Sequence, residues 1–304
     1  MIHSGPQMKR ISRIVVCALF FPLLIFGEEE EDVSFSYWDV HPLHIGGNIL
    51  RIGRADVDDT DNGHLYFRKN NAYLSLLVPI NRHNYFIPRV EFNNFTLDWN
   101  KNQKFNETHF YYAQFGLTFF TNGLDDWRWI LQGTYNLDLE HFSDPSLYGY
   151  FSLLLWGKYK LHKKWHFHVG VLGSVGLESA PVYPVLGLTW EPNKTWVFEV
   201  VFPITYSIRY KFDKNWTFSL KGRPLKERFR TGSHEPQPRS VFCYSSVGTE
   251  FNVEYEQFLW LDIQLFAGYN FGGTFYIKNQ HGRKAQYTEV GGAPYAGVTV
   301  DYGF

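Results

Sequence analysis

The segment "EHFSDP" places His141 and Ser143 two residues apart. An imidazole beside a seryl hydroxyl can accept its proton, and the activated oxygen then attacks an ester. Residues two apart on a strand face the same side, so the pair is a candidate nucleophile and base for ester hydrolysis. Because a His-x-Ser sequence arises easily by chance, we keep hydrolysis as a remote alternative.

Two segments have residue types that bind metal ions. In "WHFHV", His166 and His168 face the same side of a strand, a spacing that can hold a metal. No carboxylate or Cys lies near them in sequence, which favours two histidines in a polar network. The acidic segment "DVDDTDNG" resembles the start of a calcium loop, but the twelfth position falls on Lys69. We therefore expect no metal site and no cofactor, with weak divalent-ion binding by the acidic loop as the alternative.

A basic segment, "RPLKERFRTGSHEPQPR", is expected to form a long outer loop. It contains Arg223, Lys226, Arg228, Arg230 and Arg239 against two glutamates. Guanidinium and ammonium groups form charge-assisted hydrogen bonds to phosphate. The loop is thus a candidate contact for lipid phosphates, or alternatively a mobile, Pro-rich polar loop.

The elements that must position these residues show a period of two. From Trp127 to Leu139 the odd positions are mostly apolar and the even positions mostly polar. The segments "HFYYAQFGLTF", "YSIRYKF" and "FLWLDIQLFAGYNF" repeat this pattern. Such strands have hydrocarbon on one side and water on the other. In "RVEFNNFTLDW" the phase changes at Asn93 and Asn94, which we interpret as a bulge.

The connections between these strands alternate between short and long. This alternation, with both termini on the short-turn side, is typical of an outer-membrane barrel. Counting the connections predicts an all-β protein, a transmembrane antiparallel up-and-down β-barrel of about 14 strands, or 12 if the short strands flanking Pro203 merge. A soluble β-sandwich would need turns every ~8 to 12 residues, and several strands here are longer. The long segment "GGTFYIKNQHGRKAQYTEVGG" could fold inward across the mouth or point outward.

Composition agrees with a membrane β protein. Of the 304 residues, 44% are hydrophobic and 19% are aromatic, and the net charge of -1 argues against a nucleic-acid partner. Tyr and Trp, with one apolar and one polar part, suit a membrane interface.

The N-terminus predicts export. "MKRISRIVVCALFFPLLIFG" has three basic residues before a short apolar run and Gly27 after it. We expect a signal peptide over residues 1–27, a periplasmic segment over 28–42 and the barrel over 43–304. A single membrane anchor is the alternative, although the apolar run is shorter than the ~20 residues of a spanning helix.

The C-terminal segment "APYAGVTVDYGF" ends in a strand with Val298, Val300, Tyr302 and Phe304 on one face. It resembles the C-terminal β-signal of Gram-negative outer-membrane proteins. The resemblance implies recognition by the barrel-assembly machinery and a location in the outer membrane, among membrane lipid and lipopolysaccharide. The sequence is also similar to barrel families of unknown function, so the resemblance indicates an architecture rather than an activity.

His141 and Ser143 resemble the His-x-Ser pair of outer-membrane phospholipase A, but the extended motif that follows it there is absent.

The face opposite the apolar one should line the barrel lumen. Its charged and histidine residues have mixed signs and are Arg89, Glu91, Arg128, Asp138, Lys158, His166, His168, Glu199, Arg209, Lys211, Lys221, Glu250 and Asp262. Mixed charges suit a hydrated lumen, and equally a closed lumen in which they neutralise one another. We therefore predict a passive pore for small polar solutes that is not an enzyme. A closed barrel whose outer loops bind a ligand, lipid or partner is the alternative. The solute, the openness of the lumen and the oligomeric state stay open.

Overall fold

The computed structural model describes residues 42–58, 63–100, 104–177, 182–257, 260–279 and 286–304. Within these ranges the chain forms one antiparallel sheet of sixteen strands and a one-turn helix, α2 (Pro145–Tyr148). The strands are β1 (Leu43–Val57), β2 (Gly63–Leu76), β3 (Val78–Pro79), β4 (Asn84–Trp99), β5 (His109–Leu124), β6 (Trp127–Asp138), β7 (Tyr150–His162), β8 (Trp165–Val175), β9 (Val182–Trp190), β10 (Trp196–Phe202), β11 (Thr205–Lys211), β12 (Trp216–Arg230), β13 (Val241–Gln257), β14 (Leu261–Lys278), β15 (Gln286–Val290) and β16 (Ala293–Gly303).

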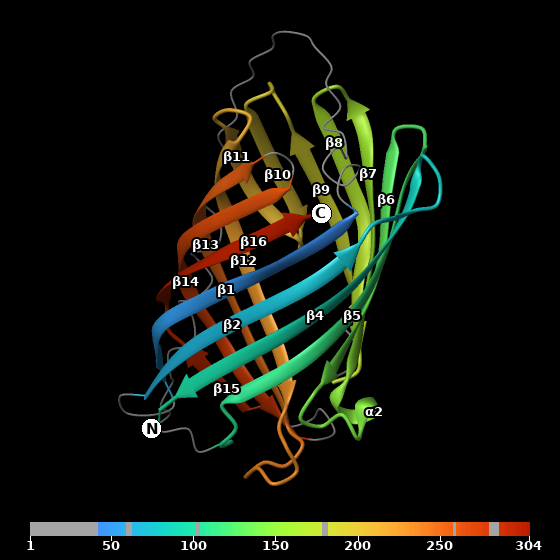
Figure 1. Cartoon of the computed structure of the whole chain (residues 1–304). Coiled ribbons are helices and arrows are strands. Elements are labelled where there is room, and N and C mark those ends of the chain that lie inside the picture. The colour runs from blue at the N-terminus through green and yellow to red at the C-terminus, as the bar shows by residue number, and fades with distance from the viewer. Residues whose placement is uncertain (1–41, 59–62, 101–103, 178–181, 258–259, 280–285) are drawn as a thin grey trace, which may run out of the picture. The chain divides into compact units, whose positions relative to one another are not determined.

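The sheet closes on itself as a barrel (Figure 1). Except at β3 and β15, each strand pairs with its sequence neighbours, and β16 pairs with β1 from His44 opposite Gly303 to Ile52 opposite Tyr295. The short strand β3 pairs with β4 beyond the end of β2, and β15 pairs with β14 and β1 beyond the end of β16. β2 with β3 counts as one barrel strand, and so does β15 with β16, so the barrel has 14 strands. The prediction of an antiparallel barrel is confirmed, with 14 strands rather than 12.

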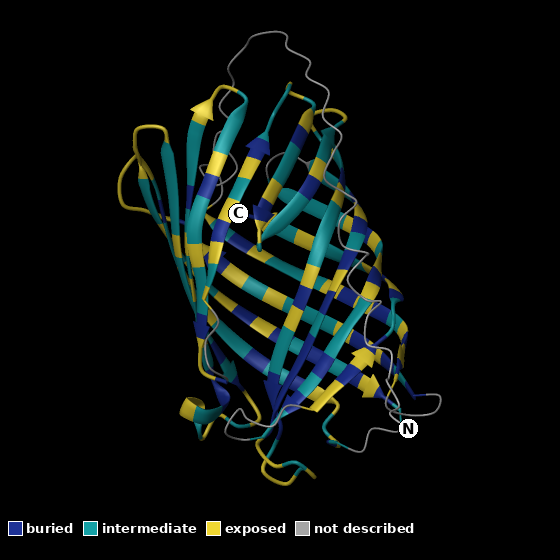
Figure 2. Ribbon diagram, turned by 180° about the vertical axis from the view of Figure 1, so that it is seen from behind, coloured by how far each residue is buried: buried dark blue, intermediate teal, exposed yellow. Residues whose placement is uncertain are grey.

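The period of two in the sequence becomes the two faces of the barrel wall. On β14, Leu265 is 55% exposed on the outer face, and its neighbour Phe266 is buried inside. Figure 2 shows exposed and buried residues alternating along the strands. An exposed apolar surface on this scale requires an apolar solvent, which for a barrel is the lipid hydrocarbon.

The two ends of the barrel differ. The turns at 80–83, 125–126 and 163–164 lie at the end where β1 begins and β16 ends, here called the short-turn end. The connections at 139–149 and 231–240 lie at the opposite, long-loop end. Outward-facing aromatic pairs mark the short-turn end, such as Trp216 and Tyr255 at 4.7 Å between ring centroids. Such a belt is expected at a membrane–water interface.

No helix in the described part of the chain is long and apolar enough to cross a membrane. The signal peptide expected over residues 1–27 lies outside the described residues, as does almost all of the expected periplasmic segment 28–42. Those boundaries stay predictions.

The bulge expected at Asn93 and Asn94 is wrong. β4 keeps an unbroken register with β2 and β5 through both residues. The alternation continues with Phe95 and Leu97 buried inside the barrel, where the sequence pattern predicted polar residues. The phase therefore stays constant, and it is the inner surface that changes from polar to apolar.

Candidate functional site

The inner surface near the short-turn end is polar and contains ion pairs. Arg89 Nη2 lies 2.7 Å from Glu91 Oε2, and Arg209 Nη2 lies 3.1 Å from Glu199 Oε2. The expected lumen residues stand on the side of the wall opposite the exposed apolar residues. Most of them have close polar neighbours, which is the arrangement that makes buried charge tolerable.

An acidic group and a basic group in this half lie on opposite sides. Glu256, Asp262 and Asp301 are directly opposite one another on β13, β14 and β16. Arg128 and Lys158 are directly opposite each other on β6 and β7, which lie seven positions from β13 and β14 in the strand order, halfway around the barrel. Each group also has a neighbour of opposite sign, such as Glu191 Oε1 at 3.9 Å from Lys158 Nζ. The field across the lumen is the part of this charge separation that such neighbours leave uncompensated.

The acidic side includes a carboxylate oxygen without a hydrogen-bond partner among the described residues. This atom is Oδ1 of Asp262, which is buried. Its neighbour Asp301, by contrast, accepts hydrogen bonds from His44 Nδ1 at 2.7 Å and from the Tyr73 hydroxyl. The Oδ1 atom of Asp262 would gain a hydrogen-bond partner from water or a solute that reached it.

The half of the lumen near the long-loop end is filled by an apolar cluster, here called the plug core. Its residues come from β1, β2, β4, β5, β12, β13, β14, β15, β16 and the 104–108 connection. They are Leu50, Ile52, Ala55, Val57, Leu65, Phe67, Phe95, Leu97, Trp99, Phe105, Phe110, Tyr112, Leu225, Phe229, Phe242, Tyr244, Phe266, Phe275, Ile277, Val290, Ala293 and Tyr295. The path along the barrel axis is closed here by packed side chains.

The outer end of the β12–β13 hairpin, residues 223–247, forms the centre of this closure. Its rings contact strands that are not its neighbours in the sheet. The Phe229 ring lies 4.9 Å from that of Phe95 on β4 and 4.5 Å from that of Phe110 on β5. The Tyr244 ring lies 5.6 Å from that of Phe67 on β2. The hairpin end therefore reaches across the lumen.

The other side of the hairpin end is covered as well. Arg228 Nη2 donates to Ser174 Oγ on β8 at 2.8 Å, and its guanidinium lies 5.5 Å from the centre of the Tyr150 ring on β7. Four consecutive residues of β13, from Val241 to Tyr244, are at most 1% exposed. A strand in the wall exposes every second residue to lipid, so this segment lies inside the wall.

The hairpin end can enter the lumen because the wall beside β12 is short, whereas β13 stays paired with β14 as far as Val241 opposite Lys278. β11 pairs with β12 only over Thr217–Gly222, and β9 pairs with β10 only from Leu186 onward. Residues 223–230 of β12 therefore have no β11 partner. Lys226 Nζ spans this interruption and donates to the Tyr183 hydroxyl of β9 at 3.1 Å.

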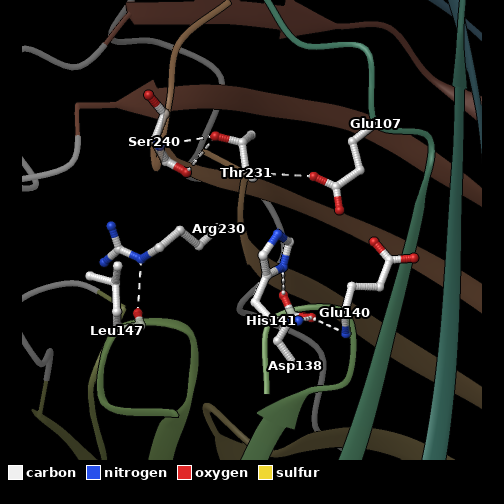
Figure 3. A network of polar contacts seen from close by, with 9 residues as sticks. Glu107, Asp138, Glu140, His141, Leu147, Arg230, Thr231 and Ser240 are labelled. Carbon is white, nitrogen blue, oxygen red and sulfur yellow. Dashed lines mark hydrogen bonds and ion pairs between the residues drawn. The ribbon is translucent and has the colours of Figure 1, made fainter. Parts of the chain in front are cut away.

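Polar contacts at the long-loop end hold the hairpin in place (Figure 3). The Arg230 side chain, 4% exposed, donates to the carbonyl oxygens of Leu147 at 2.9 Å and of Arg239 at 2.7 Å. The Gly232 amide donates to Glu107 Oε2 at 3.2 Å. These bonds connect the hairpin tip to the β4–β5 and β6–β7 connections.

Glu107 is the titratable group of this contact, and it lies in a connection outside the strands. Burial, together with a hydrogen bond to Glu140, raises the pKa of its carboxyl from 4.5 to about 8, and the Gly232 amide opposes the shift. Glu107 is therefore largely protonated at neutral pH. Ionisation above about pH 8 places a charge beside Glu140 at this anchor.

The hydrolase hypothesis finds no support in this geometry. β6 ends at Asp138, so His141 and Ser143 lie in a loop rather than on one face of a strand, which corrects the expected placement. His141 Nδ1 is 3.2 Å from Asp138 Oδ2, and its ring stacks on Tyr148 at 4.2 Å. Among the described contacts, no hydrogen bond joins His141 to Ser143.

The basic segment 223–239 is also placed differently from the expectation. Residues 223–230 belong to β12, and Arg223, Arg228 and Arg230 bond inside the barrel. Three of the five basic groups expected to meet lipid phosphates therefore face protein. The long segment around 275–289 forms β14 and β15, with Phe275 and Val290 in the plug core, and its tip at 280–285 lies outside the described residues.

The two histidines of β8 form separate polar contacts. His168 accepts from Trp156 Nε1 at 3.0 Å and contacts Thr189 Oγ1 at 2.8 Å. His166 Nε2 lies 3.6 Å from Glu191 Oε1. Within the described ranges, no three His, Cys, Asp or Glu residues gather as a metal site. The divalent-ion alternative at Asp56–Gly63 falls partly outside those ranges.

The residues expected to form an assembly signal lie at the closing seam of the barrel. Val300 and Tyr302 are exposed on the outer face of β16. Phe304 follows the end of β16, is exposed, and donates its amide hydrogen to the Leu43 carbonyl at 2.8 Å.

Sequence reasoning missed the plug core and the acidic residues Glu256 and Asp301. Asp301 had a usable signal, because it occupies a polar position of the terminal strand. The plug core had a weaker signal, the run of large apolar residues at Phe95, Leu97 and Trp99 on the inward positions of β4.

Comparison with known proteins shows the family to which this chain belongs. A family model described as a domain of unknown function (DUF6268) matches residues 90–303, which are most of the barrel. The chain belongs to this family. An uncharacterized protein of Chlamydia trachomatis serovar D is 20% identical over 84% of this chain and 85% of its own length. An uncharacterized protein of Chlamydia pneumoniae is 25% identical over 58% of this chain and 56% of its own length.

Among solved structures, an outer-membrane channel of Pseudomonas putida F1 superposes with a TM-score of 0.50. It shares 8% sequence identity, and the match covers 87% of this chain and 96% of that one. At this identity the similarity shows a shared fold. The DUF6268 chain thus has the fold of an outer-membrane β-barrel.

Proposed function

We propose that this DUF6268 protein is an outer-membrane channel for small polar solutes, that its charged inward residues line the passage, and that the β12–β13 hairpin closes it. The short-turn end faces the periplasm, and the long-loop end faces the outside.

The contrast between the two halves of the lumen supports this proposal most. The half near the long-loop end is filled with the apolar side chains of the plug core, as is typical of a closed protein interior. The other half has opposite charges on opposite sides and a carboxylate oxygen of Asp262 without a protein partner. Burying such charges without a use costs free energy, so a hydrated passage accounts for them better than a solid core.

The closure itself is tight. Between the hairpin end and the wall is a cavity of about 40 Å³, lined in part by Lys69, Asn93 and Phe229. This volume holds a water molecule and no larger solute. Conduction therefore requires the hairpin end to leave its position, while the hydrogen-bonded wall stays closed.

The transverse field suggests the preferred solute. A zwitterion can align its cationic end with Glu256 and Asp262 and its anionic end with Arg128 and Lys158. A neutral sugar of similar size gains less from this field. We therefore infer that small zwitterions pass faster than neutral solutes of equal size.

Liposome swelling with the refolded protein tests this function. Glycine should enter faster than a neutral polyol of similar size, and Asp262→Asn should reduce the ratio of the two rates. Asp125→Asn, which changes an exposed carboxylate of the β5–β6 turn, serves as the matched control. Liposomes that take up neither solute, at pH 6 and at pH 9, would favour the alternative of a closed barrel with binding loops.

A further inference from the structure

Two arginines face the membrane side of the wall near the long-loop end. Arg51 on β1 and Arg68 on β2 are directly opposite each other, and both are exposed. Their neighbours two residues away on the same face, Ile49 on β1 and Tyr66 on β2, belong to the exposed apolar surface. The outward position of the arginines follows from this alternation.

Like charges directly opposite each other on a sheet repel and destabilise the pair. No carboxylate lies within ion-pair distance of Arg51 or Arg68 in the described part of the chain, where the ion pairs involve other residues. The next row outward contains Asp98, opposite Tyr66, but it forms no ion pair with Arg68. An anion placed between the two guanidinium groups would remove the repulsion.

The surface around the arginines is hollowed. A groove of about 610 Å³ crosses β16, β1, β2 and β4 and is lined by Arg51, Ile52, Gly53, Tyr66, Phe67, Arg68, Thr96, Asp98, Pro294, Tyr295 and Ala296. Its floor combines small, apolar and aromatic residues with the two cations. This combination suits an amphiphile with a phosphate group and a hydrocarbon part.

The depth of the groove matches that of lipid headgroups. Arg51 is eight residues from Leu43, which lies at the short-turn end. Eight strand residues span roughly 26 Å, or roughly 19 Å along the membrane normal at a tilt of about 45°. The apolar band of such barrels is about 25 Å tall. The Arg51–Arg68 pair therefore lies near the far edge of the band, where flexible guanidinium groups can reach lipid phosphates.

We propose that Arg51 and Arg68 form a binding site for the phosphate of an outer-leaflet lipid, whose acyl chain lies along Ile49 and Val298. The two side chains approach one phosphate from adjacent strands, and each can donate two hydrogen bonds to it. The site is separate from the lumen, so it does not depend on conduction. It depends only on the long-loop end facing outward.

Native mass spectrometry of the detergent-solubilised barrel tests the site. The probes are a phosphorylated glycolipid of the lipid A type, the same glycolipid without its phosphates, and inorganic phosphate. Arg51→Gln and Arg68→Gln are compared singly and together. Arg54→Gln is the matched control, because Arg54 is on the same strand and exposed but pairs with Asp56 at 3.7 Å outside the groove.

The wild-type barrel should retain the phosphorylated glycolipid and release the dephosphorylated one. The double variant should bind the phosphorylated form roughly 10- to 100-fold more weakly, and Arg54→Gln should bind it normally. Equal retention by the double variant and the wild type would overturn the site. Equal loss in Arg54→Gln would show a general charge effect. Binding of inorganic phosphate as tight as that of the glycolipid would replace the lipid with a free anion. Heat modifiability on gels confirms that each variant is folded.

Discussion

Replacing Phe229 by Ala should open the channel. Phe229 is 1% exposed and contacts the rings of Phe95 and Phe110 across the lumen. Truncating a buried Phe to Ala costs about 3 to 5 kcal/mol. The wall around the plug core is held by main-chain hydrogen bonds that the substitution leaves intact, so we expect the loss to fall on the closed position of the hairpin.

This cost translates into gating. At 1.4 kcal/mol for each tenfold change, the ratio of closed to open hairpin should fall by roughly 100- to 4,000-fold. Planar-bilayer recordings should show frequent openings in Phe229→Ala and rare ones in the wild type. Phe229→Leu, which leaves a smaller cavity, should be intermediate.

Phe92→Ala is the matched control, because Phe92 is 45% exposed on the outer face of the same strand as Phe95. It should gate like the wild type. A folded, heat-modifiable Phe229→Ala barrel whose open probability equals that of the wild type would refute the assignment of the hairpin as the closure.

Three other predictions concern pH, the faces of the wall and assembly. Protonated Glu107 stabilises the hairpin anchor fully below about pH 4.5, and this contribution is lost as pH rises through about 8. Channel openings should therefore increase between pH 6 and pH 9, and Glu107→Gln should abolish this pH dependence. A wild type that is equally silent at both pH values would contradict the role of Glu107. Leu265→Arg on the lipid face should lower the free energy of unfolding by roughly 2 to 4 kcal/mol in urea titrations of folded protein in lipid, whereas Gln264→Arg on the inner face should cost much less, and equal losses would mean that the faces are misassigned. Deleting Phe304, which hydrogen-bonds to Leu43 at the closing seam, should leave export intact and remove the heat-modifiable barrel from the membrane fraction; normal barrel levels there would refute the assembly role.

The sequence allowed the outer surface and the strand number to be predicted because lipid imposes one rule on every strand. Most residues that face hydrocarbon are apolar, so the period of two shows wherever the opposite face is wet. β6 and β14 follow this rule for most of their length. The boundaries of β6 were close to those observed, whereas β14 continues beyond the expected end at Phe271 to Lys278.

The rule fails where the opposite face is dry. On β4, Phe95 and Leu97 face the plug core, so the inward positions are as apolar as the outward ones and the pattern resembles a bulge. On β12, "KERFR" was interpreted as a loop because charged residues fill it. Those charges bond to Ser174, Leu147 and Arg239, which are 9 or more residues away in sequence, and local sequence carries no trace of such partners.

The position of the hairpin can be tested most directly by tethering it. Lys69 Nζ on β2 and Glu227 Oε1 on β12 lie 3.0 Å apart across the lumen, between strands that are not neighbours. Cysteines at these two positions, in a Cys243→Ser background that also carries Phe229→Ala, can be joined by a reversible bis-methanethiosulfonate reagent. Cysteines at Phe86 and Phe119, which are opposite each other on neighbouring strands, provide the control.

Single-channel recording then gives the answer. Crosslinking residues 69 and 227 should silence the openings of the Phe229→Ala barrel, reduction should restore them, and crosslinking residues 86 and 119 should change neither. Openings that continue unchanged while residues 69 and 227 are joined would show that solutes pass without movement of the hairpin, and would contradict the gated channel proposed here.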